Sequence, residues 1–167
     1  MSLLLSQAHI KRTMKNIRYK WTDAENADFR RFYLITEEYY NSLVGGQCNR
    51  SGFIPYNLSD SIHDVLIVYI NDTAAACAGL KRYSDRDVEI KRVWVENEYR
   101  GMHIASTMMD MLEKMAGEQG FARTILQTRE IMTAAVSLYK GRGYYQIDNY
   151  PPYDRLEGAV CFAKDLI

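Results

Sequence analysis

The pattern of hydrophobic and polar positions along the chain predicts strands and helices in alternation. Apolar residues recur at helical spacing in three stretches, which predict helices over 27–44, 104–120 and 131–142. Runs of β-branched and small apolar residues predict strands over 65–70, 74–81, 88–95, 122–128, 144–147 and 159–163, after a first strand that precedes the first helix. This order predicts an α/β layer fold with a mixed sheet, antiparallel early and parallel across the helical crossover at 95–122.

Turn and capping residues mark the ends of these elements. Thr22-Asp23-Ala24-Glu25 fits the capping-box pattern before the first helix, and Gly45-Gly46 follows its end. Asn71-Asp72, between two apolar runs, predicts a tight hairpin turn. The polar segment 47–63 predicts a loop with one short helical turn, and loops of this length are often functional.

Length, charge and cysteine content narrow the class of protein. The 167 residues predict a single domain over 1–167, with residues 1–16 as a flexible or peripheral basic segment. The 21 Lys and Arg balance 21 Asp and Glu, which gives no reason to expect a nucleic-acid or membrane partner. Cys48, Cys77 and Cys161 lie far apart without a CxxC pair, so we expect no metal site, no disulfide framework and a cytoplasmic location.

The stretch YRGMHIAS, residues 99–106, begins a helix without the usual cap. Arg100 and Gly101 stand where Ser, Thr, Asp or Asn normally accepts a hydrogen bond from the first backbone amides. A strand that runs through a glycine-containing turn into such a helix is typical of phosphate binding, although the motifs for nucleoside triphosphates and dinucleotides are absent. In the alternative interpretation, Asn97 or Glu98 caps the helix and Arg100 points into water.

Two segments carry a resemblance to a known family. EIKRVWVENEYRGMHIAS (89–106) resembles motif A of the GNAT superfamily of acyl-CoA-dependent N-acetyltransferases, and AAVSLYKGRGYYQI (134–147) resembles its motif B. Arg100 and Ala105 match the ends of the motif A pattern, whereas His103 replaces its central glycine. The resemblance covers roughly residues 17–167. It implies a central sheet of about six to seven strands flanked by helices, splayed between the fourth and fifth strands, and acetyl-CoA as acyl donor without a metal.

The resemblance also implies which residues hold acetyl-CoA. Backbone amides of residues 100–106 would bind the pyrophosphate, with the Arg100 side chain as a counter-charge. Backbone groups of Val93 and Val95 would bind the pantetheine arm as an added strand, and an N–H near Val95 would polarise the thioester carbonyl. The implied cofactor-binding residues are Val93, Trp94, Val95, Arg100, Gly101, Met102, His103, Ile104, Ala105 and Ser106. Met132-Thr133 stands where many relatives carry Asn or Gln.

Two residues are predicted to be catalytic. Tyr139 matches the tyrosine that protonates the departing thiolate in many GNAT proteins; its alternative role is helix packing. Glu89 matches the family's glutamate and is our candidate for the base that an amine with a pKa near ~10 requires. Strand alternation puts Glu89 on the same face as Val93 and Val95 if no bulge intervenes. Its alternative role is a cross-strand ion pair with Lys81 or Arg82.

The resemblance leads to one functional hypothesis with two alternatives. We expect an N-acetyltransferase that moves acetyl from acetyl-CoA to a primary amine of a small molecule or amino acid by direct attack. The alternatives are a non-catalytic acyl-CoA-binding or regulatory module and a protein-directed acetyltransferase, and a homodimer is compatible with the family. Arg82 is a candidate for binding a substrate carboxylate. The residues expected to border the acceptor are Tyr39, Tyr40, Tyr56, Asn57, Arg82, Tyr83 and Tyr153.

Overall fold

The computed structural model describes residues 16–46 and 61–166. The strands are β1 (Ile17–Thr22), β2 (Asp64–Ile70), β3 (Thr73–Arg82), β4 (Asp87–Val95), β5 (Arg123–Arg129), β6 (Tyr145–Ile147) and β7 (Ala159–Asp165). The helices are α1 (Ala27–Leu43), the 3-10 turn η4 (Asn97–Tyr99), α2 (Ile104–Glu118) and α3 (Thr133–Gly141). The predicted order of strands and helices is therefore confirmed, with ends that shift by a few residues.

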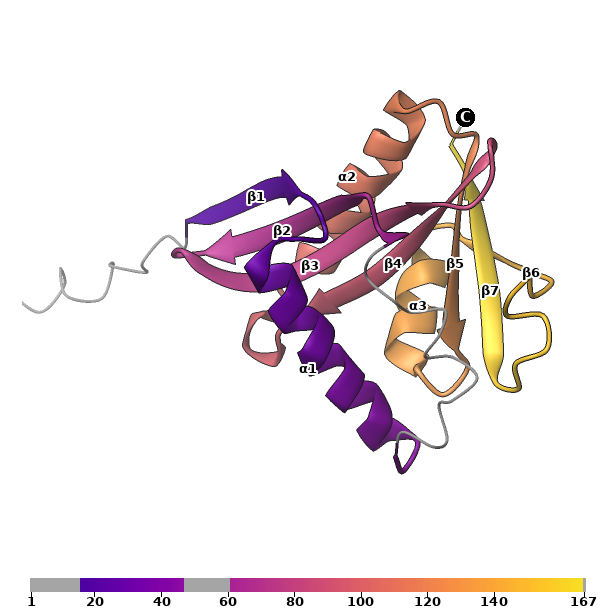
Figure 1. Cartoon of the computed structure of the whole chain (residues 1–167), viewed down its shortest axis with the longest axis horizontal. Coiled ribbons are helices and arrows are strands. Elements are labelled where there is room, and N and C mark those ends of the chain that lie inside the picture. Colours follow the sequence, from indigo (N-terminus) through magenta and orange to yellow (C-terminus); the bar gives the residue numbers. More distant parts are fainter. Residues whose placement is uncertain (1–15, 47–60, 167) are drawn as a thin grey trace, which may run out of the picture.

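The strands form one mixed sheet in the order β1-β2-β3-β4-β5-β7-β6. All neighbouring strands are antiparallel except β4 and β5, which are parallel and joined through α2 (Figure 1). This confirms the predicted mixed sheet of six to seven strands. The insertion of the last strand, β7, between β5 and β6 was not predicted.

Strands β4 and β5 diverge along their length. They pair only between residues 87–89 and 123–125, whereas β5 stays paired with β7 up to Arg129. Figure 1 shows the two strands close together at one end and apart at the other. The predicted splay between the fourth and fifth strands is therefore present, and it leaves one edge of β4 open beyond Glu89.

Helices cover the two faces of the sheet. Phe29 and Phe32 of α1 pack with Val65 and Ile67 of β2 on one face, while α2 and α3 cover the other (Figure 1). Each fully buried side chain of this size contributes about 1.5–3 kcal/mol relative to an exposed one. Burial on both faces fixes the central strands, and with them the open edge of β4.

Local side chains set the ends of the first elements. The α1 helix is capped by Asn26, whose side chain accepts hydrogen bonds from the amides of Asp28 (2.9 Å) and Phe29 (3.2 Å). The predicted capping box from Thr22 was wrong, because Thr22 ends β1 and the short Asn26 side chain directly precedes the helix. The predicted 71–72 hairpin turn is confirmed, with positive φ at both residues (47° and 64°).

A bulge at Arg92 interrupts the alternation of β4. The register against β3 shifts between Cys77 and Gly79, and Arg92 adopts a left-handed φ of 57°. Ile90 before the bulge and Val95 after it consequently pack into the same core cluster, beneath α2. The extra residue reverses the alternation of side chains along β4, so Glu89 lies on the opposite face of the sheet from Val95. The prediction that the two residues share a face required a strand without a bulge, and it therefore fails.

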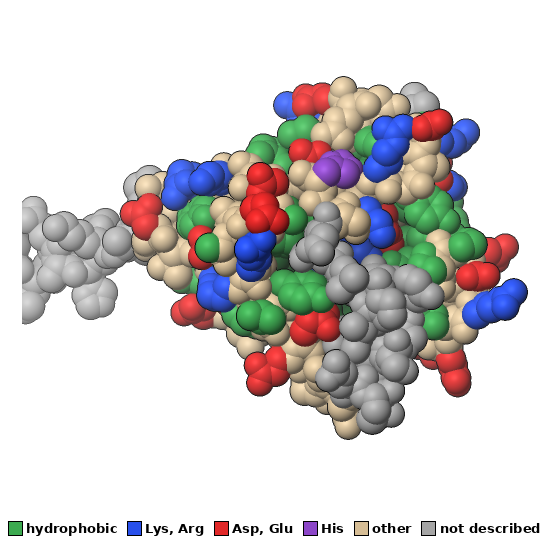
Figure 2. All heavy atoms as spheres, viewed as in Figure 1, with side chains coloured by type: hydrophobic (Ala, Val, Ile, Leu, Met, Phe, Trp, Pro, Cys, Tyr) green, Lys and Arg blue, Asp and Glu red, His purple; other side chains and the backbone are tan. Residues whose placement is uncertain are grey.

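Charged side chains of both signs share the surface, as the balanced composition predicts. On the face in Figure 2, acidic and basic side chains are interspersed. Cys77 and Cys161 are buried free thiols, and Cys48 lies outside the described residues. Over the described ranges, no helix has the length and apolar character needed to cross a bilayer. Nor do the same ranges contain a group of three or more His, Cys, Asp or Glu able to hold a metal ion.

Candidate functional site

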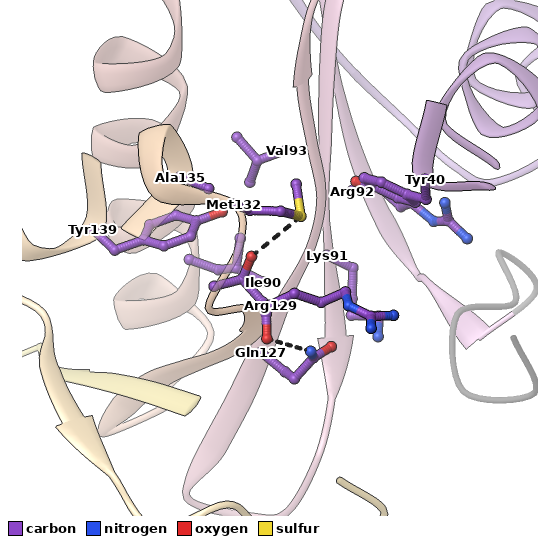
Figure 3. Close-up of a pocket in the computed structure, with 11 residues that line it drawn as sticks. Tyr40, Ile90, Lys91, Arg92, Val93, Gln127, Arg129, Met132, Ala135 and Tyr139 are labelled. Atoms are coloured by element: carbon purple, nitrogen blue, oxygen red, sulfur yellow. Dashed lines mark hydrogen bonds between the residues drawn. The ribbon is translucent and has the colours of Figure 1, made fainter. Parts of the chain in front are cut away.

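Two cavities lie where β4 and β5 diverge. The larger, of about 350 Å³, extends along Val95 to the start of α2. The smaller, of about 90 Å³, is lined by residues of β4 and by the end of β5 and is drawn in Figure 3. Residues that line both cavities are Tyr40, Val93, Met132, Ala135 and Tyr139. The two cavities therefore meet at Tyr139.

The larger cavity ends at the uncapped N-terminus of α2. His103 stands at the cap position with no side-chain hydrogen bond to the helix, and the first turn contains no acidic residue. The first intrahelical bond runs from the Thr107 amide to the His103 carbonyl (3.1 Å). The amides of Ile104, Ala105 and Ser106 therefore have no partner within the helix, and all three residues line the cavity. This arrangement provides N–H donors and a positive dipole end for an anion.

The turn before α2 uses two left-handed residues. Gly101 has a φ of 76° and His103 a φ of 60°. A residue with a side chain disfavours this conformation by about 1–2 kcal/mol. His103 thus adopts the backbone shape that glycine favours, and its replacement of the motif glycine leaves the turn intact.

The edge of β4 presents backbone groups to the larger cavity. The Glu96 amide donates to the Ala75 carbonyl (2.9 Å), and Trp94 is paired with Cys77. Because hydrogen bonding alternates along an antiparallel ladder, the N–H and C=O of the intervening Val95 point away from β3, toward the gap. Val93 precedes Trp94 and shares this edge.

Arg100 connects the end of β4 to the turn. Its Nε donates to the Val95 carbonyl (3.0 Å), and its guanidinium lies 5.2 Å from the centre of the Trp94 ring. The Arg100 side chain is exposed and also lines the larger cavity. The alternative in which it only points into water is therefore excluded, and the charge lies beside the uncapped amides.

Tyr139 is buried where the cavities meet. It is 7% exposed, and its ring packs against Tyr144 and Phe162 with ring centres 5.9 and 6.4 Å apart. Burial, with a smaller contribution from Tyr40, raises the pKa of Tyr139 well above its usual value near 10. The phenol therefore keeps its proton at neutral pH and is able to donate it.

Glu89 lies on the α1-facing side of β4, in a buried polar cluster. Its carboxylate accepts a hydrogen bond from the Tyr150 hydroxyl (3.0 Å) and lies 3.6 Å from the Lys91 ammonium. Lys91 in turn donates to the Tyr153 hydroxyl (2.7 Å). Lys81 stands opposite Glu89 in the β3 register, yet the ion pair forms with Lys91.

Lys91, and not Glu89, is in the lining of the smaller cavity. Burial lowers the pKa of Lys91 from 10.5 to about 8, and the charge of Glu89 partly opposes that decrease. A neutral fraction of Lys91 therefore exists near physiological pH. The cluster places a group that can accept a proton at the surface of the cavity, with a carboxylate directly behind it.

The sequence profile of the acetyltransferase (GNAT) family matches residues 18–144. This chain belongs to the GNAT family. The resemblance of its two motifs is thus confirmed by a match over most of the chain, and the uncapped α2 turn and Tyr139 lie at the two motif positions.

Several known proteins are similar in sequence to part of this GNAT chain. An uncharacterised N-acetyltransferase of Dictyostelium discoideum is 36% identical over 76 residues, which are 46% of this chain and 35% of that protein. The matches span about a third of the length of the curated relatives.

Solved structures match the whole GNAT fold. A Klebsiella pneumoniae protein assigned as an acyl-CoA N-acyltransferase has a TM-score of 0.71 at 21% identity, over 92% of this chain and 99% of that one. A GNAT acetyltransferase of Elizabethkingia anophelis, solved with acetyl-CoA bound, has a TM-score of 0.64 at 16% identity, over 90% and 98% of the chains. At these identities the matches show the shared fold.

The residues predicted to border the acceptor are not all brought together in this GNAT chain. Tyr39 lines the larger cavity, whereas Arg82 and Tyr83 line neither. Arg82 forms an ion pair with Asp85, and the Tyr83 hydroxyl donates to the Pro151 carbonyl (2.8 Å). Tyr153 is buried beneath the smaller cavity, on Lys91. Tyr56 and Asn57 lie outside the described residues.

Sequence reasoning missed the charged lining of the smaller cavity. Lys91 and Arg92 enter the sequence analysis only as part of the GNAT motif, and Arg129 lies one residue beyond the strand predicted over 122–128. The alternation of β5 offered one signal, because Arg129 shares a face with Gln127 and Arg123 while Leu126 packs in the core. Only the folded structure shows that residues of β4 and β5 line the same cavity.

The left-handed turn of the GNAT motif gives a stability prediction. His103→Gly is expected to exceed His103→Ala in free energy of unfolding by about 0.5–1 kcal/mol, because relief of left-handed strain outweighs the entropy that glycine adds to the unfolded chain. Chemical denaturation of both variants measures the difference. Equal or greater stability of His103→Ala would contradict a left-handed residue 103 in solution.

Proposed function

We propose that this GNAT chain transfers the acetyl group of acetyl-CoA to the primary amine of a small molecule or amino acid by direct attack. The observation that carries the proposal is the meeting of two cavities at Tyr139, one ending at uncapped helix amides and the other at charged side chains. A donor and an acceptor approaching through separate cavities would meet beside a phenol that holds its proton.

The larger cavity fits the chemistry of acetyl-CoA. The amides of residues 104–106 and the nearby Arg100 guanidinium suit a pyrophosphate, since both supply hydrogen bonds to anionic oxygens. The outward-facing backbone of Val93 and Val95 suits the amides of a pantetheine arm, which would add to the open edge of β4. Bound acetyl-CoA would supply an acetyl thioester at the meeting point of the cavities.

The transfer then requires two proton movements by the protein. As the amine nitrogen forms its bond to the acetyl carbon and the carbon–sulfur bond breaks, Tyr139 donates its proton to the leaving sulfur. The Val95 N–H, directed into the gap, stabilises the charge that develops on the carbonyl oxygen. The amine gives one proton to the acceptor side. The phenolate left at Tyr139 takes up a proton again from that side or from water before the next turnover, so that protons and charge balance.

We propose that Lys91 and Glu89 together handle the proton that the amine releases. Neutral Lys91 at the cavity surface accepts the proton, and Glu89 at 3.6 Å stabilises the resulting cation. Glu89 is then a positioning residue that acts through Lys91. The free thiols of Cys77 and Cys161 support a reducing, cytoplasmic location for this reaction.

Thermal shift with acetyl-CoA, followed by thiol release over a panel of small amines, tests the proposal. We expect stabilisation by acetyl-CoA and amine-dependent release of CoA. Glu89→Gln is expected to lower kcat without changing the Kd of acetyl-CoA. It should also move the acid limb of the kcat profile to lower pH, because loss of the carboxylate lowers the pKa of Lys91 further.

Each outcome distinguishes the proposal from its alternatives. Stabilisation without thiol release from any amine would favour a non-catalytic acyl-CoA-binding module. Release with peptides and not with small amines would favour a protein-directed acetyltransferase. An absence of stabilisation by acetyl-CoA would overturn all three.

A further inference from the structure

A side chain of the turn before α2 occupies a hydrogen-bonding position that the acyl donor needs. The Arg100 Nε donates to the carbonyl of Val95 (3.0 Å). This carbonyl belongs to the open edge of β4, to which we assigned the amides of the pantetheine arm. We propose that Arg100 blocks this edge, and that a donor displaces it only when the donor carries a pyrophosphate. The inference rests on the proposed function and deepens it, because it names the part of the donor that the site selects.

The Val95 carbonyl points into the gap between β4 and β5. Glu96 and Trp94, on either side of Val95, bond or pair with β3, so the polar groups of Val95 point away from that strand. Arg100 and Val95 both line the larger cavity. The Arg100 guanidinium and an N–H of an added strand therefore approach the same oxygen from the same cavity, and they compete for it.

A second contact holds Arg100 in this position. Its guanidinium lies 5.2 Å from the centre of the Trp94 ring, which is a cation–π distance. Trp94 is buried, and its ring packs edge-on against that of Tyr39 with ring centres 5.0 Å apart. The Trp94 ring is therefore a fixed platform, and Arg100 takes a defined place at the edge of β4 although its own side chain is exposed.

A pyrophosphate is a stronger partner for Arg100 than the carbonyl is. Two anionic oxygens match the guanidinium fork with parallel, charge-assisted hydrogen bonds, whereas a carbonyl carries no net charge. The three amides at the start of α2, which we assigned to the pyrophosphate, line the same cavity as Arg100. Within the described lining of that cavity, no Asp or Glu competes for the guanidinium. A pyrophosphate bound at the helix therefore withdraws Arg100 from Val95.

This exchange couples the two ends of the donor. Acetyl-pantetheine has the thioester arm of acetyl-CoA but no pyrophosphate, so it must displace Arg100 unaided and binds weakly. Acetyl-CoA brings the anion that removes the obstacle, and its pantetheine arm then meets an open strand edge. Because coupling is reciprocal, a pantetheine arm on that edge favours pyrophosphate binding by the same factor. Selection for the complete coenzyme thus follows from one side chain with two alternative partners.

Binding of the two parts of the donor, separately and together, tests the inference. Calorimetry gives the Kd of S-acetyl-pantetheine with and without saturating inorganic pyrophosphate. In the wild type, pyrophosphate is expected to lower this Kd by about ten-fold, within the usual range of coupling between sites. In Arg100→Ala the Val95 carbonyl has no competing donor. S-acetyl-pantetheine should therefore bind this variant about ten-fold more tightly than the wild type, and pyrophosphate should no longer improve its binding.

Two further variants separate the hydrogen bond from the charge. The amide nitrogen of Gln lies as many bonds from the backbone as the Arg Nε, so Arg100→Gln keeps a donor for Val95 but loses the charge that attracts pyrophosphate. This variant should bind S-acetyl-pantetheine as weakly as the wild type does, with or without pyrophosphate. Arg30→Ala removes an arginine of α1 that pairs with Glu25 and lines neither cavity, and it should keep the wild-type coupling.

The fluorescence of Trp94 reports the movement of Arg100 independently of affinity. Trp21 and Trp94 are the two tryptophans of the chain. Trp21 lies in β1 and lines neither cavity, so Trp21→Phe leaves Trp94 as the emitter without touching the site. Pyrophosphate is expected to change this emission as the guanidinium leaves the ring, and the change should be lost when Arg100→Ala is added.

The opposite results distinguish this inference from the proposed function. The inference is overturned if pyrophosphate has no effect on the wild-type Kd, if Arg100→Ala gains no affinity, or if S-acetyl-pantetheine binds none of the proteins. Acetyl-CoA binding with amine-dependent thiol release would leave the proposed function standing in each of these cases. Failure of acetyl-CoA itself to bind would remove both.

Discussion

Tyr139→Phe is expected to lower kcat for acetyl transfer by about 100-fold or more, within the range of general acid catalysis, while the Kd of acetyl-CoA stays unchanged. The substitution removes one oxygen from a side chain that lines both cavities and leaves the ring to pack against Phe162. Burial holds the phenol in its protonated form, and in the mechanism that we propose this oxygen supplies the proton to the leaving sulfur. Steady-state kinetics and calorimetry with acetyl-CoA measure the two quantities.

Tyr144→Phe is a matched control for this substitution. Its ring centre lies 5.9 Å from that of Tyr139, but its hydroxyl bonds Thr124 (3.0 Å) and Glu113 (3.2 Å), and it lines neither cavity. Loss of these bonds should cost about 1 kcal/mol of stability and leave kcat near the wild-type value. If the two variants lose equal activity, the Tyr139 hydroxyl has a packing role and the departing thiolate takes its proton elsewhere.

Ser106→Glu is expected to raise the Kd of acetyl-CoA by about 10- to 100-fold and, at the same time, to stabilise the free protein by about 0.3–1 kcal/mol. Ser106 is the third residue of α2, where a carboxylate reaches back to the uncapped amides. The new side chain would satisfy the same N–H groups that we assign to the pyrophosphate and would repel that group. Opposite changes in stability and affinity identify competition for one site.

Ser106→Gln separates charge from size in that experiment. Gln matches Glu in shape but carries no charge, so it should weaken acetyl-CoA binding far less. Calorimetry gives both Kd values, and denaturation of the free variants gives the stability change. If Ser106→Gln weakens binding as much as Ser106→Glu, the helix amides do not act as an anion site and the loss is steric.

The uncapped turn before α2 could be predicted from the sequence because its signals are local. The missing cap before Ile104, the glycine at 101 and the strand that precedes them lie within a few residues, and the structure confirms the turn they predict. The hairpin at 71–72 was equally local. Short segments of this kind fix their own backbone, so their interpretation does not depend on distant partners.

The lining of the smaller cavity could not be predicted in the same way. Lys91 and Arg129 come from two strands that pair with each other only near their starts, so their place on one cavity depends on how far β4 and β5 diverge. The bulge at Arg92 also had no clear sequence mark, since an arginine seldom adopts a positive φ. Contacts of Arg92 with Thr36 and Glu37 of α1 accompany that conformation, and they join residues more than fifty positions apart.

The extra residue at position 92 divides β4 into two parts with different surroundings. Before it, Glu89 and Lys91 lie on the α1-facing side of the strand; after it, Val93 and Val95 line the larger cavity. Side chains in the first part can change without moving the main chain of the second. An evolving lineage can therefore change the side chains of the first part while it inherits the main-chain course of the second part intact.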